Sequence, residues 1–125
     1  MDYDWHVLVV EDMEDDVQVI SKLLRQVGFQ VSVARNGAEC LQFLQSFKLD
    51  LVIMDLTMTE ADGSSTLVAM RCNPDTAHIP VLATTAYPSP EIEQEAIQNG
   101  FDAYFPKPIE IDDLVEQLTR VVVSQ

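Results

Sequence analysis

Residues 49–55 read LDLVIMD, a short and mostly branched apolar run that ends abruptly in the carboxylate of Asp55. Such a run, bounded by polar and turn residues, is typical of a strand that is buried on both faces of a parallel sheet. The next residues, LTMTEADG, carry the turn signal Asp62-Gly63. In open α/β sheets the carboxyl ends of the strands face the crevice where ligands bind. Asp55 is therefore a candidate functional residue from its position alone.

Strand-like and helix-like segments alternate along the chain. Apolar, β-rich runs predict five strands, at residues 5–10, 29–34, 49–55, 79–85 and 102–105. Apolar residues at helical spacing predict five helices, at residues 16–27, 38–47, 67–71, 90–99 and 111–122. Ser64-Ser65 and Ser89 are candidate N-caps, and Gly28 is a candidate C-cap. The alternation favours one doubly wound α/β domain over residues 1–125, with a parallel sheet between two layers of helices.

The composition is strongly acidic. Seven Lys and Arg residues stand against 21 Asp and Glu residues, and the formal net charge is −14. This balance argues against nucleic acid and anionic membranes as partners, and favours proteins or metal ions. No window approaches the roughly 20 apolar residues of a membrane span, and the N-terminus does not resemble a signal peptide, so we expect a soluble, cytoplasmic protein. Cys40 and Cys72 match no zinc spacing; two reduced, packed thiols are the simplest interpretation, and a single disulfide stays open.

Polar residues follow four of the predicted strands. Glu11 and Asp12 follow the first strand, Asp55 the third, Thr85 the fourth and Lys107 the fifth. In a doubly wound fold these positions converge on one crevice. Three carboxylates in one place repel one another, and Mg²⁺, which prefers carboxylate, carbonyl and water oxygens, would neutralise them. With a lysine and a hydroxyl nearby, such a site predicts phosphoryl transfer to a carboxylate nucleophile and an acyl phosphate as product.

The sequence resembles the receiver domain of two-component response regulators, such as the chemotaxis regulators, over nearly its whole length. The matching motifs occur in the family's order: Val9-Val10-Glu11-Asp12, Val52-Ile53-Met54-Asp55 with Met58 and Asp62-Gly63, Thr85-Ala86, and Tyr104 with Lys107-Pro108. The resemblance implies a flavodoxin-like fold with strand order 2-1-3-4-5 and five helices. It also implies a phosphoprotein of two-component signalling or a phosphorelay, and not an enzyme.

The resemblance assigns a role to each residue of the crevice. Asp55 would accept a phosphoryl group from a histidine kinase or a histidine phosphotransfer protein. Lys107 would pair with Asp55 and then with the phosphoryl group, and Thr85 would hydrogen-bond to that group. Mg²⁺ would be held by four groups: the carboxylates of Glu11, Asp12 and Asp55 and the backbone carbonyl of Thr57.

The resemblance further implies a switch and a tuned lifetime. Movement of Thr85 would be coupled to inward rotation of Tyr104, which reshapes the face made by the fourth helix, the fifth strand and the fifth helix. The positions that tune dephosphorylation are Thr57 and Tyr87. Neither side chain is suited to orient an attacking water, and Tyr87 is bulky enough to shield the site. We therefore expect slow loss of the phosphoryl group.

Some segments near the site depart from the family or have simpler interpretations. Thr59 stands where proline is usual, and Phe101 stands where a small residue is usual. The acids at residues 14–16 are interpreted as a solvated first helical turn that complements the helix dipole, with no ligand role. The fourth helix should be the least anchored, because it offers only three residues for burial: Ile92, Ala96 and Ile97.

Other functions use similar residues. A Mg²⁺-dependent phosphatase with an aspartate nucleophile would need a second Asp as general acid two residues after Asp55, where this chain has Thr57. A flavodoxin-like cofactor binder would need a Gly-rich phosphate loop after the first strand. A pseudo-receiver that serves only as an interaction module is the third alternative. The output and the cognate kinase stay open, and the sparse basic residues near Arg120 argue against pairing of two receivers through their fourth and fifth helices.

Overall fold

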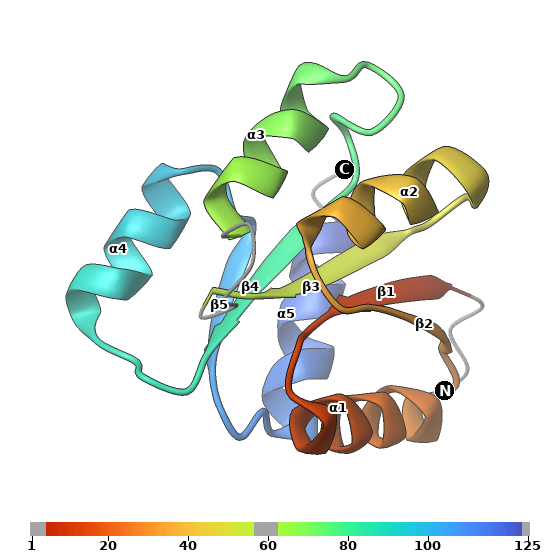
Figure 1. The fold of residues 1–125 in the computed structure, drawn as a ribbon. Helices are drawn as coiled ribbons and strands as arrows, with labels where there is room; N and C mark the ends of the chain where they lie inside the picture. The colour runs from red at the N-terminus through yellow and green to blue at the C-terminus, as the bar shows by residue number, and fades with distance from the viewer. Residues whose placement is uncertain (1–4, 57–62, 124–125) are drawn as a thin grey trace.

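The fold is a five-stranded parallel sheet flanked by helices in a computed structural model that describes residues 5–56 and 63–123 (Figure 1). The strands are β1 (His6–Val10), β2 (Gln30–Ala34), β3 (Leu51–Asp55), β4 (Val81–Thr85) and β5 (Ala103–Pro106). The helices are α1 (Glu14–Val27), α2 (Gly37–Ser46), α3 (Gly63–Cys72), α4 (Pro90–Gln98) and α5 (Ile111–Val123). The strand order is β2-β1-β3-β4-β5. The predicted α/β fold and strand order are confirmed.

Two layers of helices cover the sheet. Helices α1 and α5 lie on one face, and α2, α3 and α4 lie on the other (Figure 1). Successive residues of a strand point to opposite faces, so Val7 and Val9 of β1 join the core under α1 and α5, whereas Leu8 and Val10 join the core under the other three helices. Every residue of β3 is buried. Burial on both faces explains why residues 51–54 are continuously apolar.

Local sequence signals set several helix ends. Gly28 ends α1 with a φ of 107°, in the left-handed region that favours glycine. The side chain of Asn36 caps α2 by accepting a hydrogen bond from the backbone N–H of Glu39 at 2.9 Å. The hydroxyl of Ser89 caps α4 by accepting from the backbone N–H of Ile92 at 3.1 Å. The predicted caps at Gly28 and Ser89 are confirmed.

Several boundaries differ from the prediction, and two of these differences have a local physical reason. Helix α3 begins at Gly63, so Ser64 and Ser65 lie inside its first turn, and their assignment as N-caps is wrong. Packing of Leu67 and Met70 against the sheet stabilises this helix beyond its weak sequence signal. Strand β4 begins at Val81, two residues later than predicted, because Pro80 has no N–H to donate to a strand ladder.

Helix α4 is weakly buried. Ala96 is its one buried residue. Ile97 is 49% exposed, so the prediction that it packs inward is wrong. Phe101, which follows the helix, is 3% exposed and packs in the same cluster as Ala96. The expectation of a poorly anchored fourth helix is confirmed in terms of burial.

Arg71 and Asp102 form a polar clamp at the amino ends of the strands, opposite the candidate site. Arg71 of α3 donates to three backbone carbonyl groups and pairs with Asp102 at 2.9 Å. The Asp102 carboxylate also accepts from the backbone N–H of Val81 at 2.8 Å. The clamp therefore ties the end of α3 to the starts of β4 and β5.

The two cysteines are both free. Cys40 is buried in α2, as expected of a packed thiol, and burial raises its pKa to about 12. Cys72 is exposed at the last position of α3, so the prediction that both thiols are packed is wrong for this residue. Among the residues described, no helix has both the length and the apolar character that a membrane span requires.

Candidate functional site

Neighbouring strand ends bring the predicted site residues together. Glu11 and Asp12 follow β1, Asp55 ends β3, Thr85 ends β4 and Lys107 follows β5. These four strands are adjacent in the sheet, so their carboxyl ends share one edge. The predicted site residues therefore lie at one edge of the sheet, as expected from the sequence.

Three carboxylates form a cluster in the crevice. One carboxylate oxygen from each of Glu11, Asp12 and Asp55 lies within 4.8 Å of the other two. Glu11 is 3% exposed and Asp55 is 2% exposed. The backbone N–H groups of Asp12 and Met13 donate to Glu11 Oε2 at 3.0 and 3.3 Å, which fixes this carboxylate beside the end of β1. Buried like charges at such short range repel one another, so the cluster favours a bound cation.

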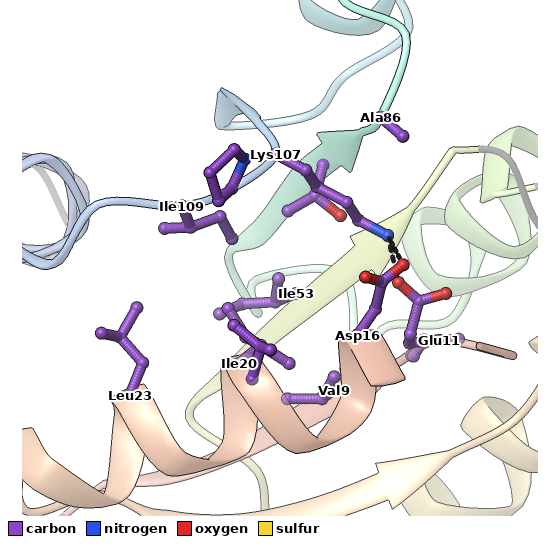
Figure 2. Close-up of a pocket in the computed structure, with 13 residues that line it drawn as sticks. Val9, Glu11, Asp16, Ile20, Leu23, Ile53, Ala86, Lys107 and Ile109 are labelled. Atoms are coloured by element: carbon purple, nitrogen blue, oxygen red, sulfur yellow. Dashed lines mark hydrogen bonds and ion pairs between the residues drawn. The ribbon is translucent and has the colours of Figure 1, made fainter. Parts of the chain in front are cut away.

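The ammonium group of Lys107 meets this cluster. Its Nζ donates to Glu11, to Asp55 Oδ2 at 3.1 Å and to Asp16 Oδ2 at 2.9 Å. Figure 2 shows the lysine side chain directed toward Asp16 and Glu11. The interpretation of Asp16 as a merely solvated residue is wrong. Its sequence context is that of an ordinary acidic first turn, which gives no sign of a contact with a lysine 91 residues away.

Burial and charge shift the pKa values of two of these groups. Burial, with the hydrogen bond and charge of Asp55, raises the pKa of Glu11 to about 7, although Lys107 opposes the shift. Burial alone would lower the pKa of Lys107, but hydrogen bonds to Glu11 and Asp16 and the charge of Asp55 outweigh it and raise that pKa above its ordinary value. Lys107 is therefore charged at neutral pH, where Glu11 is partly protonated without a bound cation.

An apolar pocket adjoins the charged crevice. It has a volume of about 310 Å³ and lies between α1 and the segment after β5. Glu11, Asp16 and Lys107 line its polar side, and its apolar wall includes Val9, Ile20, Leu23, Ile53 and Ile109 (Figure 2). The Asp16–Lys107 ion pair thus lies between a charged site and an apolar wall.

Thr85 is fully buried, and its hydroxyl oxygen accepts a hydrogen bond from the backbone N–H of Tyr87 at 3.1 Å. The hydroxyl proton can still be donated to an oxygen in the crevice. The side chain of Tyr87 is 72% exposed, so any shielding by this ring comes from a solvent-exposed position.

Tyr104 of β5 is half-buried and packs against the core under α2, α3 and α4. Its hydroxyl is buried and has no hydrogen-bond partner among the described residues. It borders a surface hollow whose other lining residues come from the start of α4 and the end of β5. A buried hydroxyl without a partner is unfavourable, which is compatible with a side chain that takes up a second position.

Several predictions fall on residues 57–62, outside the described part of the chain. They concern Thr57 as a carbonyl ligand and tuning residue, Thr59 in the loop, and the contribution of Asp62 to the turn. These stay predictions.

The chain matches the model of one known protein family over most of its length. Residues 7–119 match the model of the response regulator receiver domain. The chain belongs to this family. The resemblance seen in the sequence is confirmed, and receiver domains are typically phosphoacceptors and not true enzymes.

Relatives of this receiver domain include both short and long proteins. The polar-differentiation response regulator DivK of Brucella anthropi is 30% identical over 112 residues, which cover 90% of this chain and 91% of DivK. The transcriptional regulatory protein ZraR of Klebsiella oxytoca is 39% identical over 114 residues, which cover 90% of this chain. The chain spans only 25% of the length of that regulator.

Solved structures show the same architecture. The chemotaxis response regulator CheY4 of Vibrio cholerae superposes with a TM-score of 0.84 at 30% identity, over 95% of this chain and 99% of that chain. The receiver domain of sensor histidine kinase PA1611 from Pseudomonas aeruginosa superposes with a TM-score of 0.86 at 25% identity, over 96% of this chain and 98% of that chain. That structure holds a magnesium ion coordinated in its active-site cleft.

The donor set of this receiver domain fits Mg²⁺. It offers three carboxylates from Glu11, Asp12 and Asp55, and hard oxygen donors are the ligands that Mg²⁺ prefers. Burial, and after it the neighbouring Asp55, keeps the pKa of Glu11 raised even with Lys107 in place, so the charged form of this carboxylate is disfavoured without a further cation. A divalent cation would favour that charged form.

Proposed function

We propose that residues 1–125 act as one receiver domain in which Asp55 accepts a phosphoryl group from the phosphohistidine of a histidine kinase or phosphotransfer protein. The observation that carries this proposal is the placement of Asp55. Its carboxylate is 2% exposed at a strand end, lies in the cluster with Glu11 and Asp12, and pairs with Lys107. A nucleophile held among charged groups of both signs suits phosphoryl transfer, in which positioning and electrostatics supply most of the catalysis.

The transfer step follows from this geometry. A carboxylate oxygen of Asp55 attacks the phosphorus of the donor, and the P–N bond to the imidazole breaks as the O–P bond forms. The electron pair of the broken bond stays on the nitrogen, and the product is an acyl phosphate on Asp55. Lys107 then pairs with an oxygen of the phosphoryl group, because Asp55 no longer carries its full charge.

Glu11, Asp12 and Asp55 are the residues that would hold Mg²⁺, with the backbone carbonyl of Thr57 as the predicted fourth ligand. When bound, the ion supplies positive charge that offsets the charge of the phosphoryl oxygens.

Thr85 and Tyr104 are the proposed switch residues. The Thr85 hydroxyl already accepts from the backbone of Tyr87, so its movement toward a phosphoryl oxygen would draw on the loop that leads into α4. Tyr104 has a buried, unpartnered hydroxyl among the described residues and lies beside the weakly buried α4. The face made by α4, β5 and α5 is therefore the proposed output surface. Its partner is proposed to be a protein, since the net charge of −14 disfavours nucleic acid.

Phosphorylation by a small donor tests the proposal. The full chain is incubated with acetyl phosphate and MgCl₂, and intact mass is followed over time. We expect one added phosphoryl group that requires Mg²⁺ and is absent in Asp55→Asn. Asp75→Asn is the matched control, because Asp75 is an exposed Asp outside the crevice. Labelling of Asp55→Asn at the rate of the control would refute the assignment.

A further inference from the structure

We propose that Asp16 is a positioning residue for Lys107: it anchors the ammonium group from α1 while the other two partners of that group engage a cation and a phosphoryl group. The inference rests on the proposed function and adds to it a residue outside the motifs that carry the family resemblance. Its basis is the three-way contact of Lys107 Nζ with Glu11, Asp16 and Asp55.

The ammonium group of Lys107 can donate only a limited number of hydrogen bonds. An ammonium group has three N–H donors, and in this structure each of three carboxylates accepts from Nζ. Two of the acceptors, Glu11 and Asp55, also belong to the cluster of three carboxylates that suits a cation. Asp16 is not a member of that cluster. It is therefore the one observed partner of Lys107 whose oxygens stay free for the lysine when a cation binds.

Phosphoryl transfer changes Asp55 as a partner of Lys107 but leaves Asp16 unchanged. When Asp55 becomes an acyl phosphate, the lysine loses a full negative charge at its former acceptor and must turn toward a phosphoryl oxygen. Without a fixed contact, a long lysine side chain would sample many rotamers, and ordering it again costs conformational entropy. Asp16 limits this freedom from the helix side of the crevice.

The surroundings strengthen the Asp16–Lys107 contact. The lysine side chain is 15% exposed, and the adjoining pocket has an apolar wall that includes Ile20 and Ile109. Charges interact more strongly beside such a wall than in open water. The Asp16 side chain is 42% exposed, so solvent still screens the pair from one side. We therefore expect effects of about two- to fivefold, the range that partly exposed ion pairs produce.

Asp15 provides a matched control. It lies next to Asp16 in the first turn of α1, carries the same charge, and is exposed. Asp15→Asn and Asp16→Asn thus change the net charge equally, and both remove an acid from the first turn of α1. Only Asp16→Asn removes a charged partner of Lys107, and Asp16→Ala also removes the hydrogen-bond acceptor.

The first measurement follows the lysine itself and needs no phosphoryl donor. The chain has three lysines, Lys22, Lys48 and Lys107, so the ¹⁵N ammonium signal of Lys107 can be assigned from its loss in Lys107→Arg. We expect hydrogen exchange of this ammonium group to accelerate about two- to fivefold in Asp16→Ala, less in Asp16→Asn, and not in Asp15→Asn. Equal exchange in all variants would overturn the proposal.

The second measurement is phosphorylation by acetyl phosphate at saturating Mg²⁺. We expect the maximal rate to fall about two- to fivefold in Asp16→Ala relative to Asp15→Asn, with Mg²⁺ affinity equal within twofold. Faster exchange without a slower rate would reduce the contact to a structural ion pair and overturn the positioning role. If even the wild type fails to be labelled, the proposed function fails, while the exchange result still reports on Asp16.

Discussion

Glu11 is expected to contribute less to the stability of the metal-free protein as pH rises from about 4.5 to about 7. Its pKa is raised from 4.5 to about 7 in the folded state, chiefly by burial and then by Asp55. Between these values the folded state holds a proton that the unfolded state has released. The stabilisation is therefore complete below pH 4.5 and is lost as pH rises through about 7. At about 1.4 kcal/mol per pKa unit, the loss amounts to about 3 kcal/mol.

Urea unfolding in EDTA between pH 4 and 8, followed by circular dichroism, measures this effect. The informative quantity is the unfolding free energy of the wild type minus that of Glu11→Gln, because all other groups titrate in both proteins. We expect this difference to fall by about 3 kcal/mol across the range. Saturating Mg²⁺ at pH 8 should stabilise the wild type more than the variant, since the variant lacks one proposed ligand.

Glu14→Gln is the control for this experiment. Hydrogen bonds to Gln18 and Arg35 hold the pKa of Glu14 below its usual range, so the corresponding difference should not fall with pH. A Glu11 difference that stays flat or rises between pH 4 and 8 would refute the reasoning about the buried acid cluster.

Three further predictions test other parts of the molecule. Asp102→Ala should lower the unfolding free energy by about 2 kcal/mol, because it leaves the buried N–H of Val81 without its acceptor. Asp102→Asn should lower the unfolding free energy by less than half of that amount, and equal losses in the two variants would contradict the role of this hydrogen bond. A thiol-reactive disulfide reagent should modify Cys72 in the folded protein and Cys40 only after unfolding in urea. Modification of both cysteines in the folded protein would contradict the observed burial of Cys40. The acyl phosphate should decay slowly in the wild type and faster in Tyr87→Glu. An unchanged decay rate in the variant would count against the role of Tyr87 in tuning dephosphorylation.

The sheet and the crevice could be predicted because their signals are local. A buried parallel strand needs a continuous apolar run, and the polar residue that follows it must lie at the sheet edge. This pattern identifies Glu11, Asp55 and Thr85 as candidate site residues from the sequence alone. Their convergence requires only the strand order, which the family resemblance supplied and the structure confirmed.

The remaining errors concern contacts that depend on tertiary packing. Whether Asp16 faces solvent or Lys107 depends on how α1 is rotated about its axis against the sheet, which the packing of Ile20 and Leu24 settles. Ile97 has an apolar side chain on a short helix, but the space beneath α4 is already filled by Ala96 and Phe101. Neither outcome has a signature within a few residues of sequence.

The charge imbalance at the site and the loose attachment of α4 are connected in the proposed switch. The described residues place one ammonium group, from Lys107, against three carboxylate partners, so a further cation or a bound proton would lower the repulsion among these carboxylates. A phosphoryl group changes both the charge and the hydrogen-bond acceptors at this point. In the proposed switch, Thr85 would carry that change toward the loop before α4, where little buried surface opposes movement. A receiver with a tightly packed α4 would need a larger difference in interaction free energy between its two states to respond, so weak burial of α4 would let a local charge change suffice in the proposed switch.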